Sequence, residues 1–201
     1  MNIKTRKSLA VAIVLSAVSM LAQANTITFA PLTSTNSGAV GATYLEGGLT
    51  FTSGDGSPNG LYHWGTSQSF NADPKGSTLF ENHVGVDLVV TKTGGGSFNL
   101  DSFDLADAFN TGAASVIAFN YTDGTGAHST NLTLDTNVGL QTFAFGYAGV
   151  TSFSLRQDYP YFQLDNVTVN SVPEPETYAL MAAGLLAMGF AARRKGGKSR
   201  D

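Results

Sequence analysis

The sequence predicts that residues 25–171 form an all-β body, a two-sheet β-sandwich of the jelly-roll type. No long segment of this stretch has the 3.6-residue period of a helix, and short apolar or alternating runs recur between clusters of Gly, Asn, Asp and Ser. The turn sequences Gly94-Gly95-Gly96 and Asp123-Gly124-Thr125-Gly126 supply the positive φ angles that tight reversals need. About nine strands in this length fit two packed sheets.

Each predicted strand is a short run that places its larger side chains on one face. In the run 115–121, for example, Ile117, Phe119 and Tyr121 alternate with smaller or polar residues and point to one side. In chain order, the predicted strands are 26–30, 49–52, 84–92, 97–105, 115–121, 131–134, 141–145, 152–156 and 162–169.

The stretch 97–109 allows two interpretations. Acidic residues three apart, such as Asp101 and Asp104, suit a helical turn, and a short helix over 105–109 is one interpretation. The other is two strand phases joined by a bulge, because the alternation that begins at Phe98 is out of register with the one at Phe103. We favour the strands.

Residues 1–24 have the pattern of an export signal. Three basic side chains in the first seven residues precede an apolar stretch over 9–22, and Ala22-Gln23-Ala24 places small residues where signal peptidase cuts. The apolar stretch is short for a membrane span of about 20 residues. We expect signal peptidase to act here, so that the mature chain begins at Asn25.

Residues 172–201 form a second signal with three parts. Pro173-Glu174-Pro175 cannot continue a helix or strand, so we expect an accessible hinge there. An apolar segment, 178–192, follows, and then Arg193, Arg194 and Lys195. A helix over this segment reaches about 22 Å, less than the ~30 Å hydrocarbon core, so we expect one short transmembrane helix that holds the body temporarily. The basic cluster belongs in the cytoplasm, which places the body outside.

The body is strongly acidic and has no cysteine. Residues 25–172 hold 12 acidic side chains against Lys75, Lys92 and Arg156, a formal charge of −9. We expect no nucleic-acid binding, because almost no cations are present to neutralise phosphates. The absence of Cys excludes disulfides and thiolate metal sites, so the hydrophobic core must stabilise the fold alone.

The tail over 172–195 resembles the PEP-CTERM sorting signal of exported proteins in Gram-negative, exopolysaccharide-producing bacteria, because the three parts occur in the same order. The resemblance implies transient anchoring in the inner membrane and recognition of Pro173, Glu174 and Pro175 by exosortase, a membrane-embedded cysteine protease-like sorting enzyme. It further implies removal of the tail near the motif and release to the cell surface or extracellular matrix. The alternative is a plain C-terminal anchor whose prolines are only a linker.

Several short pieces of the body resemble a subgroup of these exported proteins that is named for a QFxxD motif just before the tail. Phe162 and Asp165 match that motif, and Tyr161 stands at the position of its glutamine. This resemblance implies a fold and a destination, and no activity. The other matching pieces are 43–52, 61–65, 71–74, 98–100 with 104–106, and 162–167.

The residue patterns of catalytic sites do not occur in the sequence. His63, His83 and His128 are isolated, with no metal-ligand spacing, and there is no Gly-x-Ser-x-Gly, phosphate loop or dinucleotide motif. We therefore expect a non-catalytic structural or glycan-binding protein of the cell surface or exopolysaccharide matrix. The alternatives are a polysaccharide-active lyase or hydrolase on a jelly-roll scaffold, and a matrix filler that binds no ligand.

Two aromatic segments are the candidates for contact with extracellular polysaccharide, since flat rings stack on the C–H faces of sugars. Tyr62 and Trp64 flank a polar, Gly-rich loop, and Tyr159 and Tyr161 lie on a predicted turn. The other interpretation places Tyr62 and Trp64 in the core or at a sheet edge.

No cofactor is expected, with the one exception of a structural calcium ion. Asp165 lies in the last predicted strand, where it could bind Ca²⁺ together with an early-strand oxygen such as that of Glu46. The alternative is that Asp165 caps backbone N–H groups in a turn.

Overall fold

The computed structural model describes residues 24–34, 36–156, 161–171, 183–186 and 188. The chain divides into two units, one of residues 23–171 and one of the two chain ends. In the second unit, residues 183–186 and 188 are helical and fall inside the predicted helix over 178–192. Among the described residues, no helix has the length and apolar character needed to span a membrane. The predicted signal peptide lies outside the described residues, apart from Ala24.

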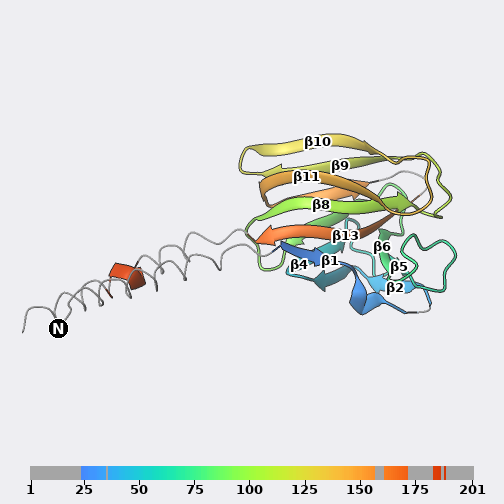
Figure 1. Ribbon diagram of the computed structural model, residues 1–201, viewed down its shortest axis with the longest axis horizontal. Coiled ribbons are helices and arrows are strands. Elements are labelled where there is room, and N and C mark those ends of the chain that lie inside the picture. Colours follow the sequence, from blue (N-terminus) through green and yellow to red (C-terminus); the bar gives the residue numbers. More distant parts are fainter. Residues whose placement is uncertain (1–23, 35, 157–160, 172–182, 187, 189–201) are drawn as a thin grey trace, which may run out of the picture. The chain divides into compact units, whose positions relative to one another are not determined.

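The body contains a seven-stranded antiparallel sheet (Figure 1). The first strand pairs with the last, from Ala24 opposite Asn170 to Ile27 opposite Val167, so the two ends of the body lie together. A single 3₁₀ turn, η2 (Ala30–Leu32), follows the first strand. The sheet runs in the order β11 (Gln141–Val150), β8 (Phe98–Asp107), β13 (Phe162–Ser171), β6 (Thr78–Glu81), β5 (Leu61–Trp64) and β2 (Gly38–Gly41), with β1 (Ala24–Ile27) also paired to β13.

A second sheet of six antiparallel strands packs against the first. Its order is β10 (Gly126–Thr133), β9 (Val116–Asp123), β12 (Ser152–Arg156), β7 (Leu88–Lys92), β4 (Leu49–Ser53) and β3 (Thr43–Glu46). Phe103 of β8 meets Phe119 of β9 and Phe153 of β12, with ring centroids 5.5 and 5.7 Å apart. These contacts join the inner faces of the two sheets, and buried Leu, Ile, Val and Phe side chains from both sheets continue the core. An extensive apolar core of this kind stabilises the fold without disulfides.

The all-β class and the two antiparallel sheets are confirmed, and each of the nine predicted strands overlaps an observed one. The jelly-roll type stays a prediction. Four short strands had not been predicted, namely β2, β3, β5 and β6.

The stretch 97–109 is a strand with a change of phase, so the helix interpretation is wrong. β8 continues to Asp107, and its buried side alternates as Phe98 and Leu100, then as Phe103 and Leu105. Both neighbours of β8 shift register opposite this change, which is the expected signature of a bulge.

Candidate functional site

Six aromatic side chains gather on the outer face of the seven-stranded sheet, and we call them the aromatic surface. On β5, Tyr62 and Trp64 alternate with the fully buried Leu61, which faces the core. The neighbouring strand places Phe80 directly opposite Tyr62. The aromatic surface consists of Tyr62, Trp64, Phe70, Phe80, Phe109 and Tyr161.

Phe80 is the ring that connects the aromatic surface. The indole of Trp64 stacks on it with centroids 5.0 Å apart, and the ring of Tyr161, the residue before β13, lies 6.2 Å away. Tyr62 meets Trp64 edge to face at 6.1 Å. Three of the four predicted glycan contacts are therefore brought together, whereas Tyr159 lies outside the described residues.

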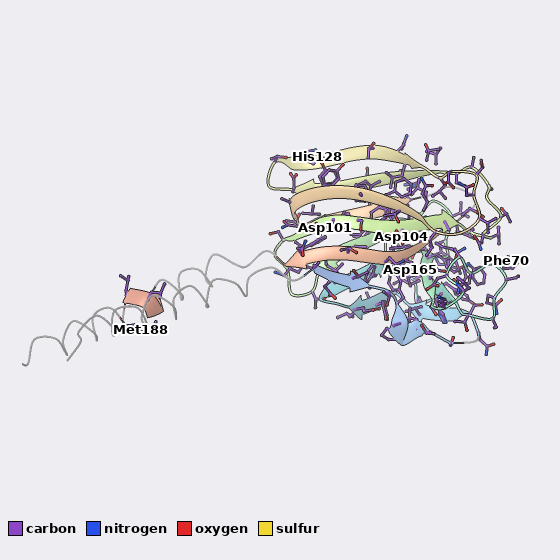
Figure 2. The ribbon with its side chains drawn as sticks, in the orientation of Figure 1. Phe70, Asp101, Asp104, His128, Asp165 and Met188 are labelled. Atoms are coloured by element: carbon purple, nitrogen blue, oxygen red, sulfur yellow. The ribbon has the colours of Figure 1, made fainter. Side chains whose placement is uncertain are left out.

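Two exposed phenylalanines, which sequence reasoning missed, complete the aromatic surface. Phe70 and Phe109 are 41% and 36% exposed, and their rings pack edge to face at 5.3 Å. Phe70 also lies 5.8 Å from Trp64, whose Nε1 donates a hydrogen bond to the carbonyl of Ala108. Figure 2 shows Phe70 at the rim of the body, far from His128. The half-buried Trp64 therefore lies beneath exposed rings that a ligand can reach.

Gln163 of β13 fixes the two loops that carry these exposed rings. Its side chain is fully buried, and its Nε2 donates to the carbonyls of Phe70 (2.7 Å) and Asp107 (2.9 Å). Its Oε1 accepts from the Ala72 amide (3.0 Å) and the Thr78 hydroxyl (2.7 Å). One amide thus ties the 65–77 loop to the loop that follows β8.

Each of these loops also has an internal polar anchor. Nδ2 of the buried Asn71 donates to the carbonyls of Gly65, Asp73 and Gly76. The buried carboxylate of Asp107 accepts hydrogen bonds from the backbone amides of residues 109, 111 and 112. Because buried polar groups with complete hydrogen bonding hold one geometry, the aromatic surface is built on rigid loops.

Asp165, the predicted calcium ligand, is completely buried. Its Oδ1 accepts a hydrogen bond from the amide of Asn166 at 2.7 Å, and its Oδ2 has no partner among the described residues. Burial, followed by the neighbouring carboxylates of Asp73, Asp104 and Glu46, raises the pKa of Asp165 to about 8. Figure 2 shows Asp104 and Asp165 on adjacent strands, where they are paired. Asp165 therefore accepts a backbone N–H as the alternative supposed, but it does so inside β13, next to a register shift, and not in a turn. A calcium ion shared with Glu46 stays a prediction.

A polar groove on the outer face of the six-stranded sheet was also missed from the sequence. Its volume is about 400 Å³. The hydroxyl of Ser154 accepts from Asn120 at 3.4 Å and donates to Asp87 at 3.3 Å. The signal in the sequence that could have indicated this polar face is the alternation of Ser152 and Ser154 with the buried Phe153. The groove is lined by Asp87, Val89, Asn120, Tyr121, Thr122, Ala127, His128, Ser129, Ser152, Phe153 and Ser154.

Beyond the body, residues 171–195 match a sequence family described as the PEP-CTERM protein-sorting motif. The chain carries a PEP-CTERM sorting motif. This motif indicates an exported protein that exosortase sorts, and it contains Pro173, Glu174, Pro175, Arg193, Arg194 and Lys195, which lie outside the described residues. A comparison with curated proteins finds no match. Resemblance to the QFxxD subgroup stays a prediction.

Proposed function

We propose that this PEP-CTERM protein is a non-catalytic component of the cell surface or exopolysaccharide matrix that binds a glycan through its aromatic surface. One observation carries the proposal: rings from separate segments of the chain converge on one face, and Phe70 and Phe109 remain exposed there. Contiguous exposed apolar surface on a soluble domain commonly marks a binding site. Aromatic rings suit sugars because they stack on C–H faces while their edges leave room for hydroxyls.

The charge of the body narrows the class of glycan. Residues 25–172 carry a formal charge of −9, and only three basic side chains are present to pair with acidic sugars. A polyanion would be repelled on approach, since like charges oppose association. The proposed ligand is therefore a neutral or weakly charged polysaccharide.

The proposed route to the matrix combines the two terminal signals. Signal peptidase removes residues 1–24 during export from a Gram-negative cytoplasm, and the helix over 178–192 holds the body at the inner membrane. Exosortase then removes the tail and releases the body. The matched sorting motif supports the last step.

A titration of the full chain with exopolysaccharide from the host tests glycan binding. Trp64 is the only tryptophan of the chain and contacts Phe70, so its fluorescence reports on ligand at the aromatic surface. We expect Phe70→Ala and Phe109→Ala each to weaken binding about tenfold, the loss that corresponds to about 1.4 kcal/mol. Leu45→Ala, which removes a 60% exposed side chain on β3 of the other sheet, is the matched control and should bind as the parent does.

The same titration separates the alternatives. Release of reducing ends or unsaturated sugars would identify an enzyme and overturn the non-catalytic role. Unchanged fluorescence together with no sedimentation of protein with polymer would identify a matrix filler. Binding that survives Phe70→Ala and Phe109→Ala but is lost in Asp87→Ala would move the site to the polar groove.

A further inference from the structure

A second cluster of polar side chains lies where one strand from each sheet ends. Asp55 lies two residues after β4 of the six-stranded sheet, and Glu81 is the last residue of β6 in the other sheet. His83 follows Glu81 after one residue. The cluster is unrelated to the aromatic surface and was not found from the sequence, because its members come from segments that the fold alone brings together.

The donor atoms of this cluster lie at distances suited to a shared metal ion. His83 Nδ1 is 2.6 Å from Asp55 Oδ2 and 3.8 Å from Glu81 Oε1. One ligand atom from each of the three side chains lies within 4.8 Å of the others. Around a tetrahedral ion with bonds of 2.0–2.1 Å, neighbouring ligand atoms are about 3.3 Å apart. The distance from His83 Nδ1 to Asp55 Oδ2 would have to lengthen by about 0.7 Å to reach that spacing, and Glu81 would bind the ion through Oε2, because its Oε1 accepts a hydrogen bond from the His83 amide.

Glu81 gives an independent indication that a cation binds here. It is only 3% exposed, and its Oε2 has no hydrogen-bond partner among the described residues. Burial is the largest cause that raises its pKa above the ordinary value, and the Ser53 hydroxyl and the His83 amide act in the opposite direction. Asp55 lies nearer than Glu81 to the imidazole of His83. A buried carboxylate left in this state costs free energy unless a proton or a cation neutralises it.

Hydrogen bonds within the protein occupy one oxygen of each carboxylate and leave the other oxygen to bind a metal ion. Asp55 Oδ1 accepts from the Ser53 hydroxyl (2.8 Å) and the Ser57 amide (2.9 Å), which leaves Oδ2 facing His83. Glu81 Oε1 accepts from the His83 amide at 3.1 Å. Contacts of this kind orient metal ligands before the ion binds.

We propose that Asp55, Glu81 and His83 form a Zn²⁺ site that joins the two sheets. The donor set of one imidazole nitrogen and two carboxylates favours Zn²⁺ over Ca²⁺, because calcium prefers oxygen ligands alone and a larger number of them. A divalent ion also neutralises the two carboxylates. Water completes the coordination at the exposed side, where Asp55 is 37% and His83 is 35% exposed.

Metal titrations of the full chain, first stripped with a chelator, test this site. Zn²⁺ stoichiometry is measured by calorimetry, the melting temperature is followed with and without Zn²⁺, and Co²⁺ is added as a spectroscopic probe of coordination. We expect one Zn²⁺ per chain, a higher melting temperature with Zn²⁺, and visible Co²⁺ absorption typical of four-coordination. His83→Asn and Glu81→Gln should each lower Zn²⁺ affinity by more than about 100-fold, since even outer contacts contribute 10–100-fold.

His128→Asn is the matched control. His128 Nε2 lies 3.1 Å from Asp123 Oδ1, so this is a second, partly exposed His–Asp pair. This variant should keep full Zn²⁺ binding. The proposal is wrong if the parent binds no stoichiometric Zn²⁺, if Ca²⁺ raises the melting temperature and Zn²⁺ does not, or if His83→Asn binds as tightly as His128→Asn. Should Glu81→Gln fail to fold, the His83→Asn comparison and the Co²⁺ spectrum of the parent decide the question.

Discussion

Replacement of Gln163 by leucine should destabilise the body far more than replacement of a comparable glutamine. The side chain makes four hydrogen bonds of 2.7–3.0 Å in a fully buried position. At about 1 kcal/mol for each bond, the free energy of unfolding should fall by about 4 kcal/mol. For a domain of this size, 1 kcal/mol corresponds to about 2–4 °C, so the melting temperature should fall by about 8–16 °C.

Gln141→Leu provides the matched control for this loss. Gln141 is partly exposed, and its Oε1 accepts a single hydrogen bond, from the Asp135 amide at 2.7 Å. Its loss should cost about 1 kcal/mol or less. Both variants are compared with the parent by differential scanning calorimetry and by urea unfolding.

The comparison has a clear refuting result. If Gln163→Leu melts within about 3 °C of Gln141→Leu, the buried amide does not hold the two loops. If Gln163→Leu melts early but binds glycan with unchanged affinity, the anchoring of the loops does not determine the shape of the aromatic surface. The rigid-loop argument predicts that stability and glycan affinity fall together.

Three further predictions concern charge, packing and sorting. The pKa of Asp165 is raised in the native state, so between about pH 4 and 8 the folded chain keeps a proton that the unfolded chain has released. The free energy of unfolding should therefore fall by about 1.4 kcal/mol per pH unit over this range. Asp165→Asn should flatten this decline, as measured by urea titrations at several pH values. Gly60→Ala should destabilise by about 1–3 kcal/mol, because its Cβ would collide with the Ser53 side chain, whereas Gly124→Ala, in open space, should be neutral in thermal melts. Alanines at 173–175 should leave an uncut, cell-associated protein on immunoblots, and normal release of trimmed protein would contradict the role of the motif.

Some of the strands that the sequence predicted have one face in the core and one toward solvent. β9 and β12 show this alternation clearly, and they were placed within two residues. β6 was missed because all four of its residues are buried, and its outward-facing Phe80 is covered by the rings of Tyr62 and Trp64. A strand covered on both faces loses the polar half of its pattern, so local periodicity cannot reveal it.

The candidate site was predictable only as a set of residue types. Tyr62, Trp64 and Tyr161 were chosen because they are aromatic and lie near turns, which local sequence can show. Their convergence depends on the order β13-β6-β5, which is a property of long-range pairing. Phe70 and Phe109 had no local signal, because their exposure follows from loops that Gln163 positions from a distant strand.

The pairing of β1 with β13 determines where the two terminal segments join the body and which end of the body lies farthest from them. Both ends of the body leave at the Ser171 end of β13, whereas Tyr161 precedes its other end. Ten extended residues separate these points by about 30 Å. A body still tethered by its tail would therefore reach its ligand with the end farthest from the tether. Cleavage after Ala24 would remove the first residue of β1, which pairs with Asn170, and would leave the pairs from Asn25 to Ile27 in place.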